Sequence, residues 1–223
     1  MKHMWRIFEA EAYRLWHGWL WLVAALTLAL VAALRVVAES VQAVAAHAAA
    51  VQKALANGRT APEMEGVGNA YGPFVDGWLA GLTVATLLLL IASSRGLASD
   101  ASSGLLRLAT TRSTPRGALV TGRALLGVPI TVGAVLVTGV ASWAAASVLF
   151  DFGPIVEDGY ELMSVDEIHG EIATAALSVV PALFAAWCFG LLISSSFRTG
   201  ATALSVGLAA FLGFDLFKGV LLL

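Results

Sequence analysis

The chain has 223 residues, of which 59% are hydrophobic and 13% charged, with a formal net charge of −2. Soluble domains are about half apolar and about a quarter charged, so this composition excludes an ordinary soluble globular protein and indicates an integral membrane protein. The single cysteine, Cys188, excludes an internal disulfide. We expect no secretory signal in this sequence, because the first apolar run is too long and no small-residue cleavage site follows it.

Residues 1–17 have the pattern of an amphipathic helix. Apolar side chains recur at spacings of three and four at Trp5, Phe8, Ala12, Leu15 and Trp16, and charged residues fall between them. Such a helix, with tryptophans at headgroup depth, lies along a membrane surface as an elbow before the chain enters the bilayer. The alternative is that this helix simply extends the first membrane span.

Five apolar stretches are long enough to cross a hydrocarbon core of about 30 Å. They cover residues 18–37, 74–94, 118–149, 172–194 and 200–217. We therefore predict an all-α, polytopic helical membrane protein with a single transmembrane domain over residues 1–223. In the third span Pro129 should kink the helix, and Thr131 and Ser142 are available to satisfy the freed backbone groups.

Residues 38–73 form an outer helix and loop in this interpretation. A seam that steps by four and three residues follows the first span at Val37, Val41, Val44, Ala48, Val51 and Leu55. We expect this helix to end at Asn57 and Gly58, a helix-ending pair. Because the seam is short and rich in alanine, we expect it to pack on its own protein rather than form a separate coiled coil.

The basic residues are distributed asymmetrically along the chain. Three Lys and Arg residues precede the first span, and five arginines lie between residues 95 and 123: Arg95, Arg107, Arg112, Arg116 and Arg123. The loop over residues 151–171 instead holds seven carboxylates and no Lys or Arg. The positive-inside rule then places the N-terminus and residues 95–117 in the cytoplasm and the acidic loop outside, in the inner (cytoplasmic) membrane of a cell.

A short amphipathic helix is predicted inside the basic segment 95–117. Leu105, Leu106, Leu108 and Ala109 lie between Gly104 and Pro115, and Arg107 and Arg112 flank the leucines. We expect this helix to lie on the inner membrane surface, where another protein can contact it.

This segment resembles the first cytoplasmic loop of the permease subunits of ABC-2 type ATP-binding-cassette transporters. That loop reads acidic residue, Gly-Thr-Leu, a leucine-rich turn, Pro-x-Ser-Arg, and Gly-Lys at the start of the next span. The matching residues here are Asp100, Gly104, Leu105, Leu106, Leu108, Pro115, Arg116, Gly122 and Arg123. Asp100 stands for the usual Glu, Leu105 for the Thr and Arg123 for the Lys, and Pro115 lies nearer the Arg than in the family.

The resemblance implies an exporter subunit driven by a separate cassette ATPase, with a second permease subunit as homodimer or heterodimer partner. It implies a short coupling helix at Gly104–Thr111 and six spans, of which five are readable here. The ATPase contact would comprise Asp100, Gly104, Leu105, Arg107, Leu108, Arg112 and Arg116. ATP and Mg would bind the partner, so no cofactor is expected in this chain; membrane lipids and an extracytoplasmic protein are further expected partners, and nucleic acid is not.

No catalytic or metal motif is evident in the sequence. The chain lacks a Gly-x-x-x-x-Gly-Lys-Ser/Thr phosphate loop and any zinc-type His or Cys spacing. Glu167, His169 and Glu171 are a candidate outer cation site, although such acidic loops are more often simply solvated. An intramembrane enzyme is disfavoured because Cys188 has no partner histidine at depth. A membrane scaffold that transports nothing remains an alternative.

Ionisable residues are scarce within the spans. Arg35, Asp76 and Asp215 fall near the outer span ends, so they form either an ion-pair cluster or three separate interfacial charges, and coupling to protons or sodium is disfavoured. Three small-xxx-small pairs would allow close helix packing: Gly77 with Gly81, Ala203 with Gly207, and Ala209 with Gly213. Five spans leave the C-terminus outside, and residues 219–223 read as the start of a further apolar stretch.

Overall fold

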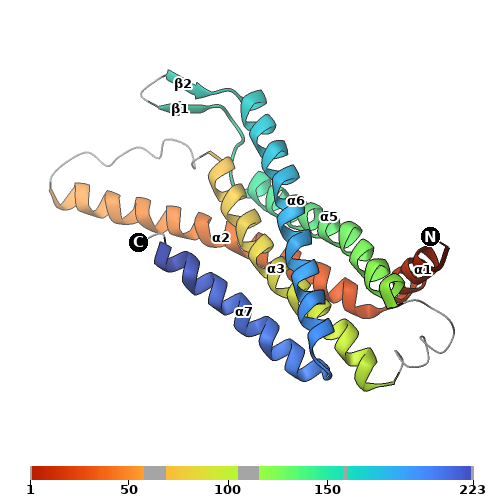
Figure 1. The fold of residues 1–223 in the computed structure, drawn as a ribbon. Coiled ribbons are helices and arrows are strands. Elements are labelled where there is room, and N and C mark those ends of the chain that lie inside the picture. Colours follow the sequence, from red (N-terminus) through yellow and green to blue (C-terminus); the bar gives the residue numbers. More distant parts are fainter. Residues whose placement is uncertain (1, 58–68, 105–115, 158–159, 222–223) are drawn as a thin grey trace. The chain divides into compact units, whose positions relative to one another are not determined.

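The fold consists of long helices and one short hairpin, seen in a computed structural model that describes residues 2–57, 69–104, 116–157 and 160–221 (Figure 1). Its elements are α1 (Lys2–His17), α2 (Trp19–Ala56), α3 (Tyr71–Ser102), α5 (Arg116–Leu149), β1 (Ile155–Glu157), β2 (Tyr160–Met163), α6 (Val165–Ser196) and α7 (Gly200–Leu221). Among the described residues, five helices are long and apolar enough to cross a membrane, namely α2, α3, α5, α6 and α7. The predicted all-α fold and its five spans are confirmed.

The helices contribute to two compact units. The first unit comprises Met1–Ala24, Thr83–Ala134 and Ser178–Leu223, and the second comprises Ala25–Leu82 and Val135–Leu177. Helices α2, α3, α5 and α6 therefore supply one part of their length to each unit.

Local hydrogen bonds define where the helices begin. The Asn69 side chain accepts a hydrogen bond from the backbone N–H of Tyr71 at 3.1 Å and so caps α3. Ser164 and Glu167 form a capping box at the start of α6, because each side chain accepts a hydrogen bond from the other's backbone N–H. Thr199 caps α7 through the N–H of Thr202. These caps satisfy backbone donors that have no partner within their own helix.

Two helices extend beyond the predicted spans. Helix α3 continues past Ser94 to Ser102, so the start of the predicted cytoplasmic loop 95–117 is helical. Helix α6 begins at Val165, and β1 and β2 form an antiparallel hairpin within the predicted acidic loop 151–171. Hydropathy identifies only the part of a helix that is apolar enough to cross the membrane. The helix itself continues into polar residues until capping and packing end its hydrogen bonds.

The N-terminal segment forms its own helix, as predicted. Helix α1 ends at His17 and α2 begins at Trp19, with Gly18 between them. The predicted end of α2 is also confirmed, because the helix runs to Ala56 and the N–H of Asn57 donates to the carbonyl of Lys53 at 3.2 Å.

The predicted seam of α2 is largely exposed in the second unit. Val41 is 62% exposed, Val44 54% and Leu55 62%, so the described residues of this unit do not cover the seam, and its packing on another part of the protein stays a prediction. The buried residues of α2 are Leu28, Ala32 and Val36, which lie on another face of the helix. A repeat of four and three shows which residues share a stripe but not what covers that stripe.

Close helix packing in the second unit depends on the predicted Gly77 and Gly81 pair. A Cβ atom on Gly77 would clash with Ser142 on α5 and Val36 on α2, and one on Gly81 would clash with Thr138. The Ser142 hydroxyl donates to the Phe74 carbonyl at 2.6 Å. The prediction of close approach is therefore confirmed, and these glycines let α3 pack directly against two helices.

The role predicted for Ser142 beside Pro129 is wrong. Pro129 does lie inside α5, and Thr131 donates to the nearby Val128 carbonyl at 2.9 Å. Ser142, however, donates across to α3 and serves helix packing instead of the backbone near the proline.

Candidate functional site

The structure describes only part of the predicted ATPase contact. Asp100 lies in the last turn of α3, Gly104 follows that helix, and Arg116 is the first residue of α5. Leu105, Arg107, Leu108 and Arg112 lie outside the described residues, together with the predicted coupling helix. The candidate site is therefore the place where α3 and α5 flank this segment.

Arg123 on α5 joins α3 and α1 in the first unit. Its Nη2 atom donates to Glu11 Oε1 on α1 at 2.7 Å, and its Nε atom donates to the same oxygen at 3.2 Å. The same Nη2 also donates to Asp100 Oδ2 on α3. We name Glu11, Asp100 and Arg123 the Arg123 cluster. It ties three helices together through one guanidinium.

The side chains of the Arg123 cluster are mostly removed from solvent. The exposed fractions are 11% for Arg123, 23% for Glu11 and 18% for Asp100. Charges in such surroundings interact more strongly than exposed pairs, and removing one leaves its partner uncompensated. The two carboxylates outnumber the guanidinium, so the cluster would carry a net negative charge when all three groups are ionised. It would not attract an anionic ligand.

Gly96 on α3 lies close to the guanidinium. A Cβ atom at this position would lie 3.5 Å from Arg123 Nη1, an ordinary van der Waals distance, so the contact does not require glycine. Gly96 and Asp100 are four residues apart and so share one face of the helix. The Nη1 atom is buried and has no hydrogen-bond partner among the described residues, so the described hydrogen bonds of the guanidinium come from Nε and Nη2.

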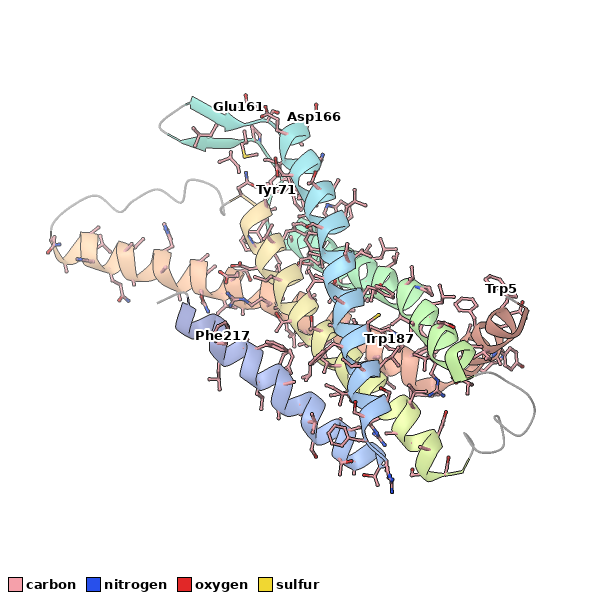
Figure 2. The ribbon with its side chains drawn as sticks, viewed as in Figure 1. Trp5, Tyr71, Glu161, Asp166, Trp187 and Phe217 are labelled. Atoms are coloured by element: carbon pink, nitrogen blue, oxygen red, sulfur yellow. The ribbon has the colours of Figure 1, made fainter. Side chains whose placement is uncertain are left out.

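Trp187 brings α6 to the same turn of α5. Its Nε1–H donates to the main-chain carbonyl of Arg123 at 3.1 Å. The indole lies against Gly127, where any Cβ atom would clash with the ring. Trp187 is buried, and Figure 2 shows it beside the middle part of α6. The carbonyl and the side chain of Arg123 thus contact different helices.

Helices α3, α6 and α7 meet through small residues beside the Arg123 cluster. A Cβ atom on Gly190 of α6 would clash with Ser93, and one on Gly207 of α7 would lie 3.1 Å from the hydroxyl of Ser94. The Ser194 hydroxyl accepts a hydrogen bond from the N–H of Ala98 at 3.0 Å. The Ala203 and Gly207 pair therefore makes a close contact as predicted, whereas a Cβ atom on Gly213 would meet nothing within 4 Å among the described residues.

Gly104 ends α3 in a left-handed backbone conformation. Its φ is +77°, a region that residues with a Cβ atom adopt only at a cost in energy. Its N–H donates to the Ala101 carbonyl at 3.3 Å. This conformation favours glycine at the end of α3, which gives a structural role to one residue of the predicted contact.

Two residues of this site, Glu11 and Trp187, were not predicted from the sequence. Glu11 lies on a helix that carries several other charges, and Trp187 lies in an apolar run, so neither differs visibly from its surroundings. The only sequence signal was the resemblance that named Asp100 and Arg123. Their pairing depends on helices that are distant in sequence.

The candidate cation site at Glu167, His169 and Glu171 is not formed. Glu167 serves the capping box with Ser164, and His169 Nε2 lies 3.2 Å from the Tyr71 hydroxyl. Among the described residues no three His, Cys, Asp or Glu side chains are placed to hold a metal ion. Figure 2 shows Tyr71, Glu161 and Asp166 near the hairpin end of the second unit.

The outer charges in the second unit form a partial cluster. Arg35 Nη2 lies 2.5 Å from Glu39 and 3.7 Å from Asp76, with Arg35 41% exposed and Asp76 50% exposed. The hypothesis of pairing is confirmed for Arg35 and Asp76, and for Asp215, which lies in the first unit, it stays a prediction.

These observations describe a helical protein with five candidate membrane spans and a partly buried ionic cluster that joins α1, α3 and α5. Comparisons of the chain with protein-family models, curated proteins and solved structures found no match.

Proposed function

We propose that this chain is the transmembrane subunit of an ABC-2 type exporter in the inner (cytoplasmic) membrane. The N-terminus and residues 95–117 face the cytoplasm, in line with the distribution of Lys and Arg. A separate cassette ATPase supplies the energy, and the chain acts as a homodimer or with a similar second subunit. Apolar spans without charges at their centres suit a hydrophobic, lipid-like or polymeric substrate.

The Arg123 cluster is the observation that carries this proposal. Residues 105–115 connect the end of α3 to the start of α5, and the ion pair of Asp100 with Arg123 ties these helices beside that connection. A force on the connecting segment is therefore applied to two helices as one body. Glu11 and Trp187 extend the connection to α1 and α6. A transmembrane subunit that receives mechanical work from an ATPase needs such a junction.

The ATPase contact is assigned to residues of the connecting segment and its flanks. Arg107 and Arg112 provide positive charge, and Leu105 and Leu108 provide apolar surface for a cleft on the ATPase. In the competing interpretation the arginines only follow the charge rule and hold lipid headgroups. The scaffold alternative needs no ATPase at all.

Charge reversal separates these interpretations. We expect the ATPase to stop co-purifying with the double variant Arg107→Glu with Arg112→Glu. In the proposed contact the two arginines face negative charge on the ATPase, and two glutamates would repel that charge. The matched control is Arg198→Glu, a reversal at an exposed site between α6 and α7. Unchanged ATPase association in the double variant would remove the docking role, and a purified wild-type assembly without any ATPase would favour the scaffold.

Coupling is tested separately from docking. We expect Arg123→Gln to keep the ATPase bound, because the substitution lies outside the proposed contact. ATP-dependent export from reconstituted vesicles should fall, since the force no longer reaches α1, α3 and α5 together. Full export by a stable Arg123→Gln variant would contradict the proposed role of the cluster.

A further inference from the structure

The exposed stripe of α2 has the pattern of a parallel coiled coil. It continues the predicted seam toward the helix start, and its members occur every four and three residues at Leu30, Leu34, Val37, Val41, Val44, Ala48, Val51 and Leu55. Leu30 is 53% exposed and Leu34 56%, much as Val41 and Val44 are. The stripe thus runs from the apolar part of the helix into its polar extension.

The stripe lies opposite the face that α2 buries in its own protein. Ala32 and Val36 are fully buried, and Leu30 and Leu34 each precede one of them by two residues. Two residues correspond to about 200° around a helix, so the two faces point in opposite directions. The described residues of the second unit cover the face of Ala32 and Val36 and leave the face of Leu30 and Leu34 exposed.

The length of α2 puts the far part of the stripe in water. The helix has 38 residues and is therefore about 57 Å long, whereas the hydrocarbon core is about 30 Å thick. Within the bilayer an exposed leucine contacts lipid and provides no hydrophobic driving force for association. Beyond the bilayer the exposed Val41, Val44 and Leu55 contact water, so covering them is favourable.

The residues beside the stripe are suited to a second copy of the same helix. They are small or uncharged at neutral pH: Ala38, Ser40, Ala45, His47, Gln52 and Ala54. Two copies therefore meet without repulsion between like charges, and the alanines allow a close approach. The charged residues of the extension, Glu39 and Lys53, fall at the heptad position farthest from the stripe. Copies inserted with the same topology also have parallel α2 helices, so identical residues face one another.

We propose that two copies of this chain associate through their α2 helices as a parallel, in-register pair that continues outside the membrane. This inference selects the homodimer within the proposed function and names its surface. It rests on the membrane-spanning part of that proposal and does not depend on the ATPase.

Single cysteines test this pairing in membranes. In a Cys188→Ala background, Val44→Cys and Ala48→Cys should each form a disulfide with the same position of a second copy under mild oxidation, because stripe positions approach within disulfide range. The matched control is Ala46→Cys, which is also exposed but lies on the far side of the helix. Equal cross-linking at all three positions, or none at Val44 and Ala48, would overturn the proposal.

A second measurement covers variants that fail to cross-link for other reasons. We expect Val41→Asp with Val44→Asp to reduce the dimer fraction about tenfold in single-molecule photobleaching, whereas Gln42→Asp with Ala46→Asp should leave it unchanged. An unchanged dimer in the first variant, or a different protein cross-linked at Val44, would overturn the pairing. Cross-linking without any ATPase in the assembly would support the pairing and reject the ATPase, so the two failures are distinguishable.

Discussion

The indole of Trp187 on α6 donates a hydrogen bond to the main-chain carbonyl of Arg123 on α5, at 3.1 Å. The side chain of the same arginine binds Glu11 on α1 and Asp100 on α3. One residue therefore connects α5 to three other helices, and its backbone and side chain do so independently. Substitutions can separate the two connections.

We expect Arg123→Gln to lower the free energy of unfolding by about 3 kcal/mol, because two mostly buried carboxylates would lose their positive partner. The value lies at the lower end for buried ion pairs because Glu11 remains 23% exposed. Reversible unfolding in mixed micelles measures it. Arg198→Gln, at an exposed position, should change the stability by less than about 0.5 kcal/mol. Equal effects of the two substitutions would show that the cluster contributes nothing specific.

We expect Gly127→Ala to destabilise the protein by about 1–3 kcal/mol, because the new methyl group forces the Trp187 ring away from α5. The control is Gly133→Ala in the same helix, where a Cβ atom meets nothing within 4 Å among the described residues. That change should be neutral or stabilise by up to about 1 kcal/mol, since alanine favours helix. Unfolding of both variants in micelles measures the difference, and a stabilising Gly127→Ala would contradict the packing.

At the end of α3, we expect Gly104→Ala to cost about 1 kcal/mol, because alanine disfavours a φ of +77°. Gly104→Asn should cost less, since asparagine tolerates the left-handed region better. The order of the two variants is the informative result, and their unfolding free energies provide it. Gly117→Ala, at an open helical position in α5, is the control. If alanine were tolerated as well as asparagine, the result would contradict the left-handed backbone conformation of Gly104.

Arg35 and Asp76 should contribute much less than the Arg123 cluster. Both side chains are at least 41% exposed, and such ion pairs are worth about 1 kcal/mol or less. We expect Arg35→Asp and Asp76→Arg to reduce assembly slightly when introduced singly, and the double exchange to restore it partly. The yield of folded protein from membranes provides the measurement. No mutual rescue in the double variant would count against the pairing.

Hydropathy predicted the membrane spans but not where the helices begin and end. The five spans were predictable because a bilayer requires about twenty consecutive apolar residues, a property that is local in sequence. The end of α3 at Ser102 and the start of α6 at Val165 were not predicted, because they depend on Gly104 and on the capping box of Ser164 and Glu167. These are single-residue signals that a span of apolar residues neither contains nor requires.

The α2 stripe shows a second limit. Its spacing of four and three was visible in the sequence, yet the described residues of the second unit leave Val41, Val44 and Leu55 exposed. Periodicity determines which side chains share one face of a helix, whereas burial depends on where the neighbouring helices lie.

The sequence by itself determined that this is a helical membrane protein with five apolar helices and a basic segment between the second and third of them, because apolar length and charge are properties of consecutive residues. Only the tertiary structure decided that Glu11, Asp100, Arg123 and Trp187 meet. They lie on four different helices, and it is the packing of these helices, with the Trp187 ring directly against Gly127, that brings them within hydrogen-bond distance.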